Sequence, residues 1–410
     1  MFFVSAYRPE QFGIARYVPH YVDALVSAGW SVEVCAPYPF FPAWKLDKSV
    51  PPVSHEHGGS VRVTRYAPFV PRRHSALTRG MHEGSIALHA IKMLRRHPGN
   101  ADLMVVTSPP VLAAACAVRI AHRNREPCLL LAYDLVADLA SDAYGLAGRA
   151  AGLVLHRVEA DLCARADRVI ALTDDMATRI RRIAKRSTHV SVIRIWADDE
   201  LFHIDHTAAA SAARARLGIP GDRGLIGFAG SFGRKQRLEE VLAALRALPP
   251  AYTTVFMGDG PNRQELERMA AEGPGDVRIL PPQPVAALHE FLSACDLSIV
   301  IAWTEHAGSL FPSKVANILA AGSPILAITR RDTELAGLLE RERIGVVCPS
   351  LDADEIRQAV QRGMALARDP DCHERCRRYA RAHLDRGRAM ERFLAEVREL
   401  VPGDARPLGR

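Results

Sequence analysis

Residues 225–236 read LIGFAGSFGRKQ, in which an apolar run at 225–230 is followed by a turn and then by a helical pattern. A short apolar run of this kind is typical of a strand buried in a parallel sheet. Gly230 and Gly233 allow the backbone to turn tightly between the strand and the helix. The stretch therefore predicts an α/β fold, and it marks the start of the second of two sets of strands.

Similar apolar or β-branched runs recur on both sides of this stretch, with helical patterns between them. The runs before it lie at 2–7, 31–36, 103–107, 128–133, 168–172 and 190–195, and those after it at 253–258, 277–280, 296–301, 324–328 and 344–348. This alternation predicts two parallel sheets with crossover helices. Because such sheets bind ligands at the carboxyl ends of their strands, we expect two Rossmann-like domains whose sheets face a central cleft.

The alternation of strand and helix patterns is interrupted at 196–223, where acidic residues, alanine, glycine and proline dominate. This interruption predicts the hinge between the domains. A chain of 410 residues suits two domains of about 100–200 residues each. We place the first domain at 1–200 and the second at 201–383. No strand follows the helices expected near 352–367 and 388–400, so we expect the segment at about 384–402 to pack back on the first domain.

The composition is that of a globular protein, with 48% apolar and 24% charged residues. The first residues lack the basic start and the length of a signal peptide, and no run reaches about 18 apolar residues, so we expect a cytoplasmic protein. The eight cysteines follow no regular framework, which favours reduced thiols. A zinc site at Cys372, His373 and Cys376 is disfavoured because no second ligand pair accompanies them, and we expect neither a metal nor a cofactor.

The positive charge is concentrated in the first half, where residues 1–200 carry 25 Lys and Arg against 19 Asp and Glu. One basic segment contributes much of it and alternates with apolar side chains: Arg72, Arg73, Leu77, Arg79, Met81, Ile86, Ile91, Lys92, Leu94, Arg95 and Arg96. The segment is either a solvated helix face or a surface for an anionic membrane at its cytoplasmic side. Nucleic acid is disfavoured, because no stacking aromatic residues accompany the charge.

The strongest local motif is the sequence LFPSK at 310–314, followed by a helical run at 315–321 and by Gly322. Pro312 favours an extended residue before it, Ser313 is suited to cap the helix, and Gly322 is suited to end it. Free amide groups at the helix start, together with Lys314, suit a diphosphate whose negative charge grows as a sugar nucleotide is cleaved. The alternative is an ordinary capped helix with a surface lysine.

Other loops follow strands at the same predicted edges. In the second half these are the turn with Gly230, Arg234 and Lys235, in which the basic side chains can reach phosphate, and the GDGP sequence at 258–261. In the first half, the loop at 9–14 links a strand to a helix and turns its amides toward the cleft. Asp134 and Asp138 follow another strand, where each carboxylate either holds sugar hydroxyls or caps a helix.

These motifs together resemble the retaining GT-B glycosyltransferases of family 4, especially bacterial exopolysaccharide enzymes of the colanic acid fucosyl and fucosamine transferase type. The resemblance covers nearly the whole chain. In the first half it rests on PEQFGI at 9–14, Tyr133-Asp134-Leu135 with Asp138, ADRVI at 166–170, and Trp196-Ala197-Asp198 before Leu201-Phe202. In the second half it rests on Ala229-Gly230 with Lys235-Gln236, GDGP at 258–261, and Pro312-Ser313-Lys314 with NILAAG at 317–322.

The chain departs from the wider family at several site positions. Two glutamates that the family carries eight positions apart correspond to Ser309 and Asn317 here, and Glu305 does not replace the first. The usual glycine pair near the start reads Phe12-Gly13. The usual Arg and Lys of the diphosphate loop read Ser231 and Gln236, which shifts the expected donor contacts toward Arg234, Lys235 and Lys314.

The resemblance implies a role for each candidate residue. Catalysis is assigned to Lys314, Arg234, Lys235 and Asp134. Donor binding is assigned to Gly230, Ser231, Gly258, Gly260, Pro281, Gln283, Ser309, Leu310, Ser313 and Asn317. An acceptor or phosphate loop is assigned to Glu10, Gly13 and Asp138.

The resemblance also implies a hexosyltransferase-type enzyme that takes a sugar from a UDP or GDP sugar. Its acceptor is expected to be a saccharide, or a saccharide carried on polyprenyl diphosphate, in polysaccharide synthesis. The first domain would hold the acceptor and the second the nucleotide sugar. Two alternatives remain open: a sugar-nucleotide epimerase of the same fold, and a non-catalytic protein that binds nucleotide sugars.

Overall fold

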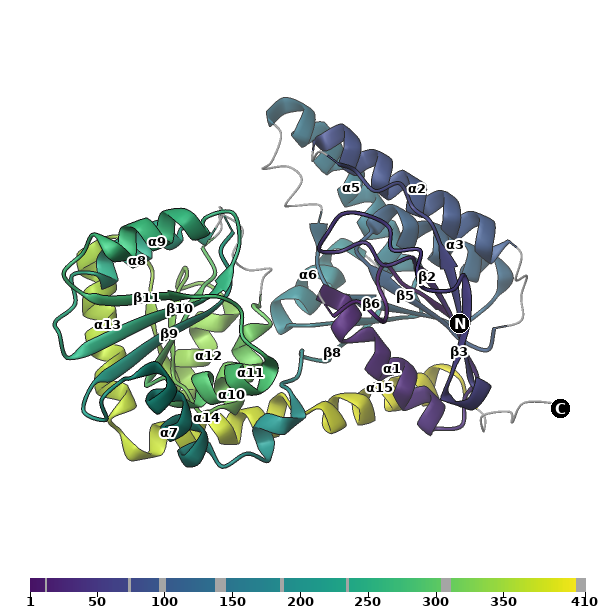
Figure 1. Ribbon diagram of the computed structural model, residues 1–410. Helices are drawn as coiled ribbons and strands as arrows, with labels where there is room; N and C mark the ends of the chain where they lie inside the picture. The colour runs from purple at the N-terminus through teal and green to yellow at the C-terminus, as the bar shows by residue number, and fades with distance from the viewer. Residues whose placement is uncertain are drawn as a thin grey trace. The chain divides into compact units, whose positions relative to one another are not determined.

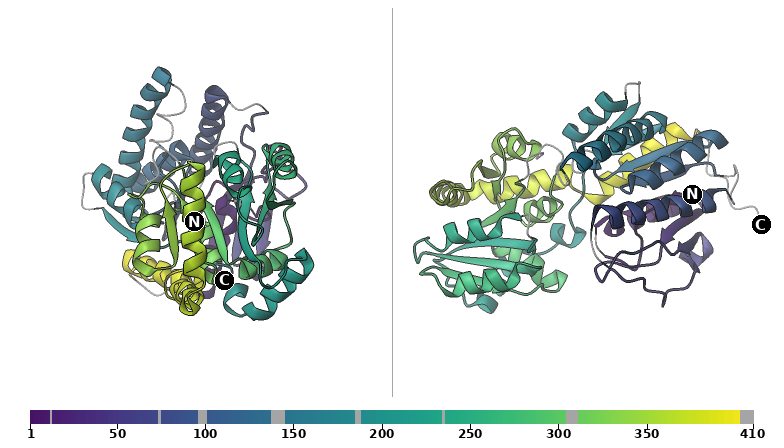
Figure 2. Two further views of the ribbon diagram at one scale, coloured as in Figure 1. Left: turned by 90° about the vertical axis from the view of Figure 1, so that its left-hand side faces the viewer. Right: turned by 90° about the horizontal axis from the view of Figure 1, so that it is seen from above.

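The structure is a computed structural model that describes residues 1–11, 13–72, 75–95, 101–136, 145–184, 188–233, 236–303 and 311–402. The chain forms two compact units, Met1–Arg194 with Ala389–Arg410, and Ile195–Arg388. The boundaries between the units thus lie after residues 194 and 388. The boundaries predicted from the sequence lie after residues 200 and 383. Each unit is built around one sheet with helices on both faces (Figures 1 and 2).

The sheet of the first unit has eight strands in the order β3-β4-β2-β1-β5-β6-β7-β8. The strands are β1 Phe2–Phe3, β2 Val32–Pro37, β3 Val53–Glu56, β4 Val61–Tyr66, β5 Met104–Ser108, β6 Cys128–Ala132, β7 Arg168–Ala171 and β8 His189–Val192. The helices are η1 Gly13–Arg16, α1 Val18–Ser27, η2 His57–Gly59, α2 Ala76–Leu94, α3 Val111–Asn124, α5 Gly145–Arg165, α6 Asp174–Ala184 and, from residue 389 onward, α15 Arg386–Leu400. Figure 1 shows α2, α3 and α5 on one face of this sheet and α1 with α15 on the other.

Two strands of the first sheet were missed by the sequence analysis. β3 and β4 form an antiparallel hairpin, so the sheet is not parallel throughout as predicted. In β4, Val61 and Val63 are buried whereas Arg62 between them is exposed. This alternation has the period of a strand with one solvated face, so β4 does not read as a continuous apolar run.

The second unit holds a six-stranded parallel sheet in the order β11-β10-β9-β12-β13-β14. Its strands are β9 Gly224–Ser231, β10 Tyr252–Asp259, β11 Asp276–Leu280, β12 Leu297–Ile301, β13 Ile325–Ile328 and β14 Gly345–Cys348. Its helices are η3 Asp199–Phe202, α7 His206–Leu217, α8 Leu238–Leu245, α9 Arg263–Ala271, α10 Val285–Ala294, α11 Lys314–Ala320, α12 Glu334–Glu342, α13 Ala353–Ala367 and α14 Pro370–His383. Val255 and Phe256, consecutive residues of β10, belong to separate buried clusters, as expected for a sheet covered on both faces.

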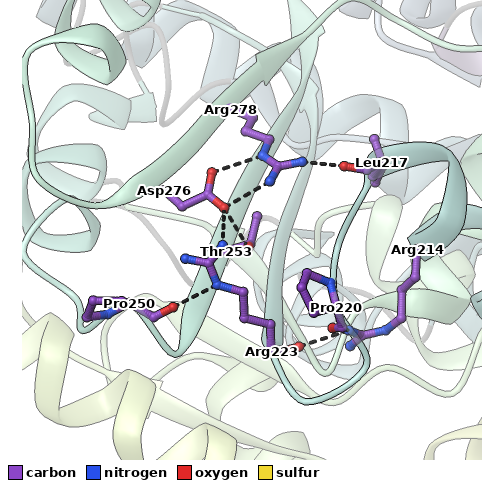
Figure 3. A network of polar contacts seen from close by, with 8 residues as sticks. All are labelled: Arg214, Leu217, Pro220, Arg223, Pro250, Thr253, Asp276 and Arg278. Atoms are coloured by element: carbon purple, nitrogen blue, oxygen red, sulfur yellow. Dashed lines mark hydrogen bonds and ion pairs between the residues drawn. The ribbon is translucent and has the colours of Figure 1, made fainter.

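A polar network fastens the amino ends of strands β9, β10 and β11 (Figure 3). The Asp276 carboxylate accepts hydrogen bonds from Arg278 at 2.9 Å, Arg223 at 2.9 Å and the Thr253 hydroxyl at 2.8 Å. Arg223 also donates to the carbonyl of Pro250 at 2.7 Å. The hydrogen bond from Arg278 is the main reason that the pKa of Asp276 is lowered. This network holds the amino ends of the strands together. The loops that follow the carboxyl ends of these strands lie at the other end of the sheet, so the network does not form part of them.

Of the helices in the described part of the chain, none is both long and apolar enough to span a membrane.

Candidate functional site

The second sheet changes direction between its neighbouring strands β9 and β12. From β9 the chain continues to β10 and β11 on one side, and from β12 it continues to β13 and β14 on the other. In open α/β sheets, ligands bind outside the carboxyl ends of the strands at such a switch point. The loops that follow β9 and β12 are therefore the candidate site of this unit.

Glycines allow the carboxyl ends of β9 and β10, and the loops that follow them, to pack closely. A side chain on Gly258 would overlap the carbonyl oxygen of Gly230, and a Cβ on Gly260 would lie 2.7 Å from the carbonyl oxygen of Phe232. The Phe232 amide donates to the carbonyl of Asp259 at 2.8 Å. The predicted donor residues Gly230, Gly258 and Gly260 thus lie together, with the exposed Ser231 at the end of β9.

Lys314 reaches the same place from the other side of the switch point. Its ammonium nitrogen lies 4.0 Å from the centroid of the Phe228 ring, and a Cβ on Gly230 would be 2.6 Å from this nitrogen. Burial lowers the pKa of Lys314 to about 8. No hydrogen bond or ion pair links the ammonium to another described residue. The side chain is half-buried, and since a cation that is partly removed from water without an anion is costly, the position suits a ligand that carries negative charge.

The helix start beside Lys314 differs from the prediction in one respect. Ser313 precedes α11, but its side chain makes no capping hydrogen bond, so the expected cap is wrong. The residue is in a helical conformation, with φ −57°, whereas a capping side chain requires an extended backbone. The helix end agrees with the prediction: Gly322 follows it with φ +87°, a conformation that favours glycine.

The side-chain amide of Asn317 in α11 makes two hydrogen bonds within the second unit, through its oxygen and through its nitrogen. Its Oδ1 accepts from the Asp198 amide at 2.9 Å, and its Nδ2 donates to Asp198 Oδ2 at 2.8 Å. The same carboxylate oxygen lies 2.9 Å from His289 Nε2. These bonds position α11, the helix that begins with Lys314. The sequence analysis noted Asp198 only as part of a motif and gave no role to His289.

The remaining predicted donor residues either lie farther from Lys314 or lie outside the described part of the chain. Pro281 and Gln283 lie in the loop between β11 and α10, where Gln283 Nε2 donates to the Pro281 carbonyl at 3.0 Å. Because β10 separates β11 from β9, this loop is at the same edge of the sheet but not beside Lys314. The residues outside the described part of the chain are Arg234, Lys235, Ser309 and Leu310, and their roles stay predictions.

In the first unit the sheet changes direction between β1 and β5, and the predicted acceptor loop follows β1. Glu10 Oε1 accepts hydrogen bonds from the amides of Phe40 at 2.7 Å and Phe41 at 2.8 Å. The carboxylate therefore ties the loop after β1 to the loop after β2. Gly13 begins η1 with φ +54°, and no atom lies within 4 Å of the position that a Cβ would take.

Asp134 follows β6 at the same edge of the first sheet. Its Oδ1 is buried, and no hydrogen bond to another described residue satisfies it. Burial raises the pKa of this carboxyl. The predicted role of Asp134 toward a hydroxyl of the acceptor stays a prediction. Its predicted neighbour Asp138 lies outside the described residues.

Cys372, His373 and Cys376 do not form a metal site in the described structure. The ring nitrogens of His373 lie 2.8 Å from the Gly322 carbonyl and 3.1 Å from the Ala367 carbonyl. Elsewhere among the described residues, no group of three His, Cys, Asp or Glu side chains is arranged to hold a metal ion.

The chain matches two family models. The glycosyl transferase 4-like domain matches residues 12–196, and the glycosyl transferases group 1 model matches residues 210–383. Among sequence relatives, the Escherichia coli K12 protein named as a colanic acid biosynthesis glycosyl transferase, WcaI, is 27% identical over 402 residues. This alignment covers 96% of the present chain and 98% of that protein.

Solved structures with the same fold cover nearly the whole chain. Sucrose-phosphate synthase from Thermosynechococcus elongatus has a TM-score of 0.73 at 19% identity, over 98% of both chains. HepE from Anabaena, solved in complex with UDP, has a TM-score of 0.67 at 15% identity, over 97% of this chain and 99% of that chain. At these identities the structures establish a shared fold.

Proposed function

Since this chain belongs to the family 4 glycosyltransferases with the GT-B fold, we propose that it moves a sugar from a nucleoside diphosphate to a saccharide acceptor with retention of configuration. The observation that carries the proposal is Lys314. Its side chain is half-buried, and the ammonium beside Gly230 and Phe228 at the switch point of the second sheet has no anionic partner among the described residues. A diphosphate is the ligand that this charge would neutralise. The UDP bound by the similarly folded HepE is consistent with this class of donor.

In the proposed reaction, the bond between the sugar C1 and the diphosphate oxygen breaks as the acceptor oxygen attacks the same face of the sugar. The acceptor proton passes to the departing phosphate oxygen, so that a nucleoside diphosphate leaves. Lys314 stabilises the negative charge that grows on this group. Asp134, with its unsatisfied buried oxygen, orients a hydroxyl of the acceptor and does not attack carbon.

We further propose that transfer needs no divalent metal. The positive charge of Lys314 neutralises the diphosphate directly, together with Arg234 and Lys235, whose contacts with the diphosphate are predicted. Proton NMR of a fresh product, made in excess EDTA from an α-linked donor, tests retention and metal independence together. A β-linked product contradicts retention, and activity restored only by Mg²⁺ or Mn²⁺ contradicts metal independence.

A panel of UDP, GDP and dTDP sugars, each with and without saccharide acceptors, tests the overall function. The expected result is release of one nucleoside diphosphate together with an acceptor that gains one sugar. Conversion of the donor alone into its epimer would identify an epimerase. A protein that binds the donor but neither transfers the sugar nor slowly hydrolyses the donor would be a binding protein.

For the acceptor, we propose a saccharide on a polyprenyl diphosphate at an anionic membrane surface, in the polysaccharide context named for the relative WcaI. Leu77, Met81 and Leu88 of α2 are 74%, 50% and 68% exposed. Their spacing of four and seven residues places them on one helix face, and the exposed Lys92 and Arg95 continue that face toward the helix end. An apolar stripe with basic residues at one end suits insertion among anionic lipids.

A further inference from the structure

A groove of about 480 Å³ follows the outer edge of β14, the last strand of the second sheet. Residues 345–349 form its floor, and among the described residues no strand pairs with this edge. Since β13 lies between β14 and β12, the groove is not part of the switch point. The side chains at its rims are all charged or polar: Arg331, Glu340 of α12, and Glu355, Gln358 and Arg362 of α13.

The backbone of β14 directs amide and carbonyl groups into this groove. The carbonyls of Ile344 and Cys348 accept hydrogen bonds at 3.1 Å from amides in and just after β13. Because the direction of these groups alternates along a strand, those of Gly345 and Val347 point away from β13 and toward the groove. An open edge of this kind can extend its sheet by pairing with another strand.

Helices flank the groove on both faces of the sheet. Val347 packs in the same buried cluster as Leu339 of α12, whereas Cys348 packs in a different cluster with Ile356 of α13. The two helices therefore cover opposite faces of β14. The space between them is open at the level of the sheet, where an added strand would lie.

Three exposed residues of α13 form a polar stripe along this edge. Gln358 and Arg362 follow Glu355 by three and seven residues, so the three lie on one helix face. Glu355 is in the first turn of α13, at the carboxyl end of β14. Arg362 lies about 10 Å farther along the helix, toward the amino ends of the strands. A Cβ on the adjacent Gly363 would lie 2.7 Å from Leu297, the first residue of β12, which agrees with this placement.

We infer that this groove binds a second copy of the chain, with the two β14 strands antiparallel about a two-fold axis. Such an axis exchanges the two ends of β14 and sets the two α13 helices side by side on one face of the joined sheet. Glu355 of each copy then faces Arg362 of the other. Gln358 meets its own counterpart, and its amide can both donate and accept. With the axis at Val346, the groups of Gly345 and Val347 exchange hydrogen bonds between the copies.

The charges of the rims favour this occupant over others. Two arginines and two glutamates leave the groove without a net charge that would select a small anion or cation. Arg331 and Glu340 already form an ion pair at 3.3 Å, whereas Glu355 and Arg362 form none with another described residue. A parallel strand from a second copy would bring like charges of α13 together, so only the antiparallel arrangement satisfies both.

Sedimentation velocity over a range of protein concentrations tests the inference. The parent protein should dimerise reversibly. Glu355→Lys and Arg362→Glu should each raise the dissociation constant of the dimer by at least about tenfold, because each places like charges together at both symmetric contacts. The double variant again has opposite charges at these contacts and should dimerise nearly as the parent protein does. Both side chains are exposed, so neither substitution disturbs the core.

Glu391→Lys is the control for the change in net charge, since Glu391 is exposed on α15 and does not line the groove. The inference is overturned if the parent protein stays monomeric, or if the single variants dimerise as the parent does. It is also overturned if the double variant is no better than the single ones, or if Glu391→Lys weakens the dimer equally. None of these measurements uses a sugar nucleotide, so their outcome is independent of the proposed transfer.

Chemical cross-linking tests the position of the two-fold axis. A short bismaleimide should join Gln358→Cys into a covalent dimer, because this residue lies opposite its counterpart in the second copy. The parent protein and Glu391→Cys should give no such product. Cross-linking of Gln358→Cys that is no greater than that of Glu391→Cys would contradict the proposed axis.

Discussion

The ammonium nitrogen of Lys314 lies 4.0 Å from the centroid of the Phe228 ring. Phe228 belongs to β9, and Lys314 begins the helix that follows β12, so the contact joins the two strands between which the sheet changes direction. A cation over an aromatic face is held by the negative potential of the ring. The contact fixes the ammonium in position while leaving its hydrogen atoms available to a ligand.

Lys314→Ala should lower the rate of sugar transfer by at least about tenfold. One charge-assisted contact to a diphosphate contributes about 1.5–3 kcal/mol, and each 1.4 kcal/mol corresponds to a factor of ten. Initial rates of nucleotide release, measured with the donor found in the panel, give the comparison. Near-normal turnover by Lys314→Ala would remove this residue from the donor site.

The stability of the protein without ligand should also depend on Lys314. The pKa of about 8 in the folded protein lies below the ordinary value of 10.5, so the unfolded chain binds more protons between these two values. The free energy of unfolding should therefore rise as the pH increases from about 8 to about 10.5. Lys314→Met should lack this part of the rise and should be more stable near neutral pH by on the order of 2 kcal/mol. Urea denaturation of both proteins across this range checks the sign, and equal pH profiles would contradict it.

Gly258→Ala should disrupt the contact between the carboxyl ends of the paired strands β9 and β10. Its Cβ would overlap the carbonyl oxygen of Gly230, and backbone cannot move aside as a flexible side chain can. We expect a loss of about 1–3 kcal/mol in the free energy of unfolding, together with weaker nucleotide binding. Gly337→Ala is the control: a Cβ on Gly337 in α12 would meet no atom within 4 Å outside the backbone of its own helix, so alanine should be neutral or stabilising there. The pair is compared by thermal unfolding with and without nucleotide.

Asp276→Asn should destabilise the second unit at neutral pH. The pKa of Asp276 is lowered, mainly by the hydrogen bond from Arg278, so the charged carboxylate stabilises the fold above the ordinary pKa of about 4. This stabilisation is lost as the pH falls through the folded pKa, so the variant and the parent protein should converge in acid. We expect a difference of about 1–3 kcal/mol at neutral pH. Asp332→Asn, which removes an exposed pair with Arg330, should cause no measurable change.

Exchange of Leu77 and Leu88 for serine should weaken binding to anionic vesicles. Both side chains are more than half exposed on α2, and each would lose a contribution from apolar burial in the lipid. Flotation with vesicles of phosphatidylglycerol and phosphatidylcholine measures the effect. Binding by the parent protein should also decrease as salt rises, because the basic residues contribute through charge. Val285→Ser, at a residue that is 56% exposed on α10, is the control. Flotation without any preference for anionic lipid would refute the membrane surface.

The sequence predicted the features that depend on local pattern. Apolar runs such as 225–230 and 253–258 identified strands β9 and β10, because a strand buried on both faces has few polar positions. Gly322 marked the end of α11, because the left-handed turn after a helix favours glycine. The motifs around Lys314 and Gly258 indicated family 4 and the GT-B fold, and the comparisons confirm both.

The tertiary structure alone decided which distant residues meet and which charges are buried. Asn317 and Asp198 are 119 residues apart in the chain, and Glu10 and Phe40 are 30 apart, so no local pattern predicts either contact. The hairpin of β3 and β4 depends likewise on strand pairing. The sequence alone indicated that Lys314 is either an ordinary surface lysine or a phosphate ligand. Only the fold half-buries its side chain and lowers its pKa, because desolvation depends on the atoms around a group and not on its neighbours in the chain.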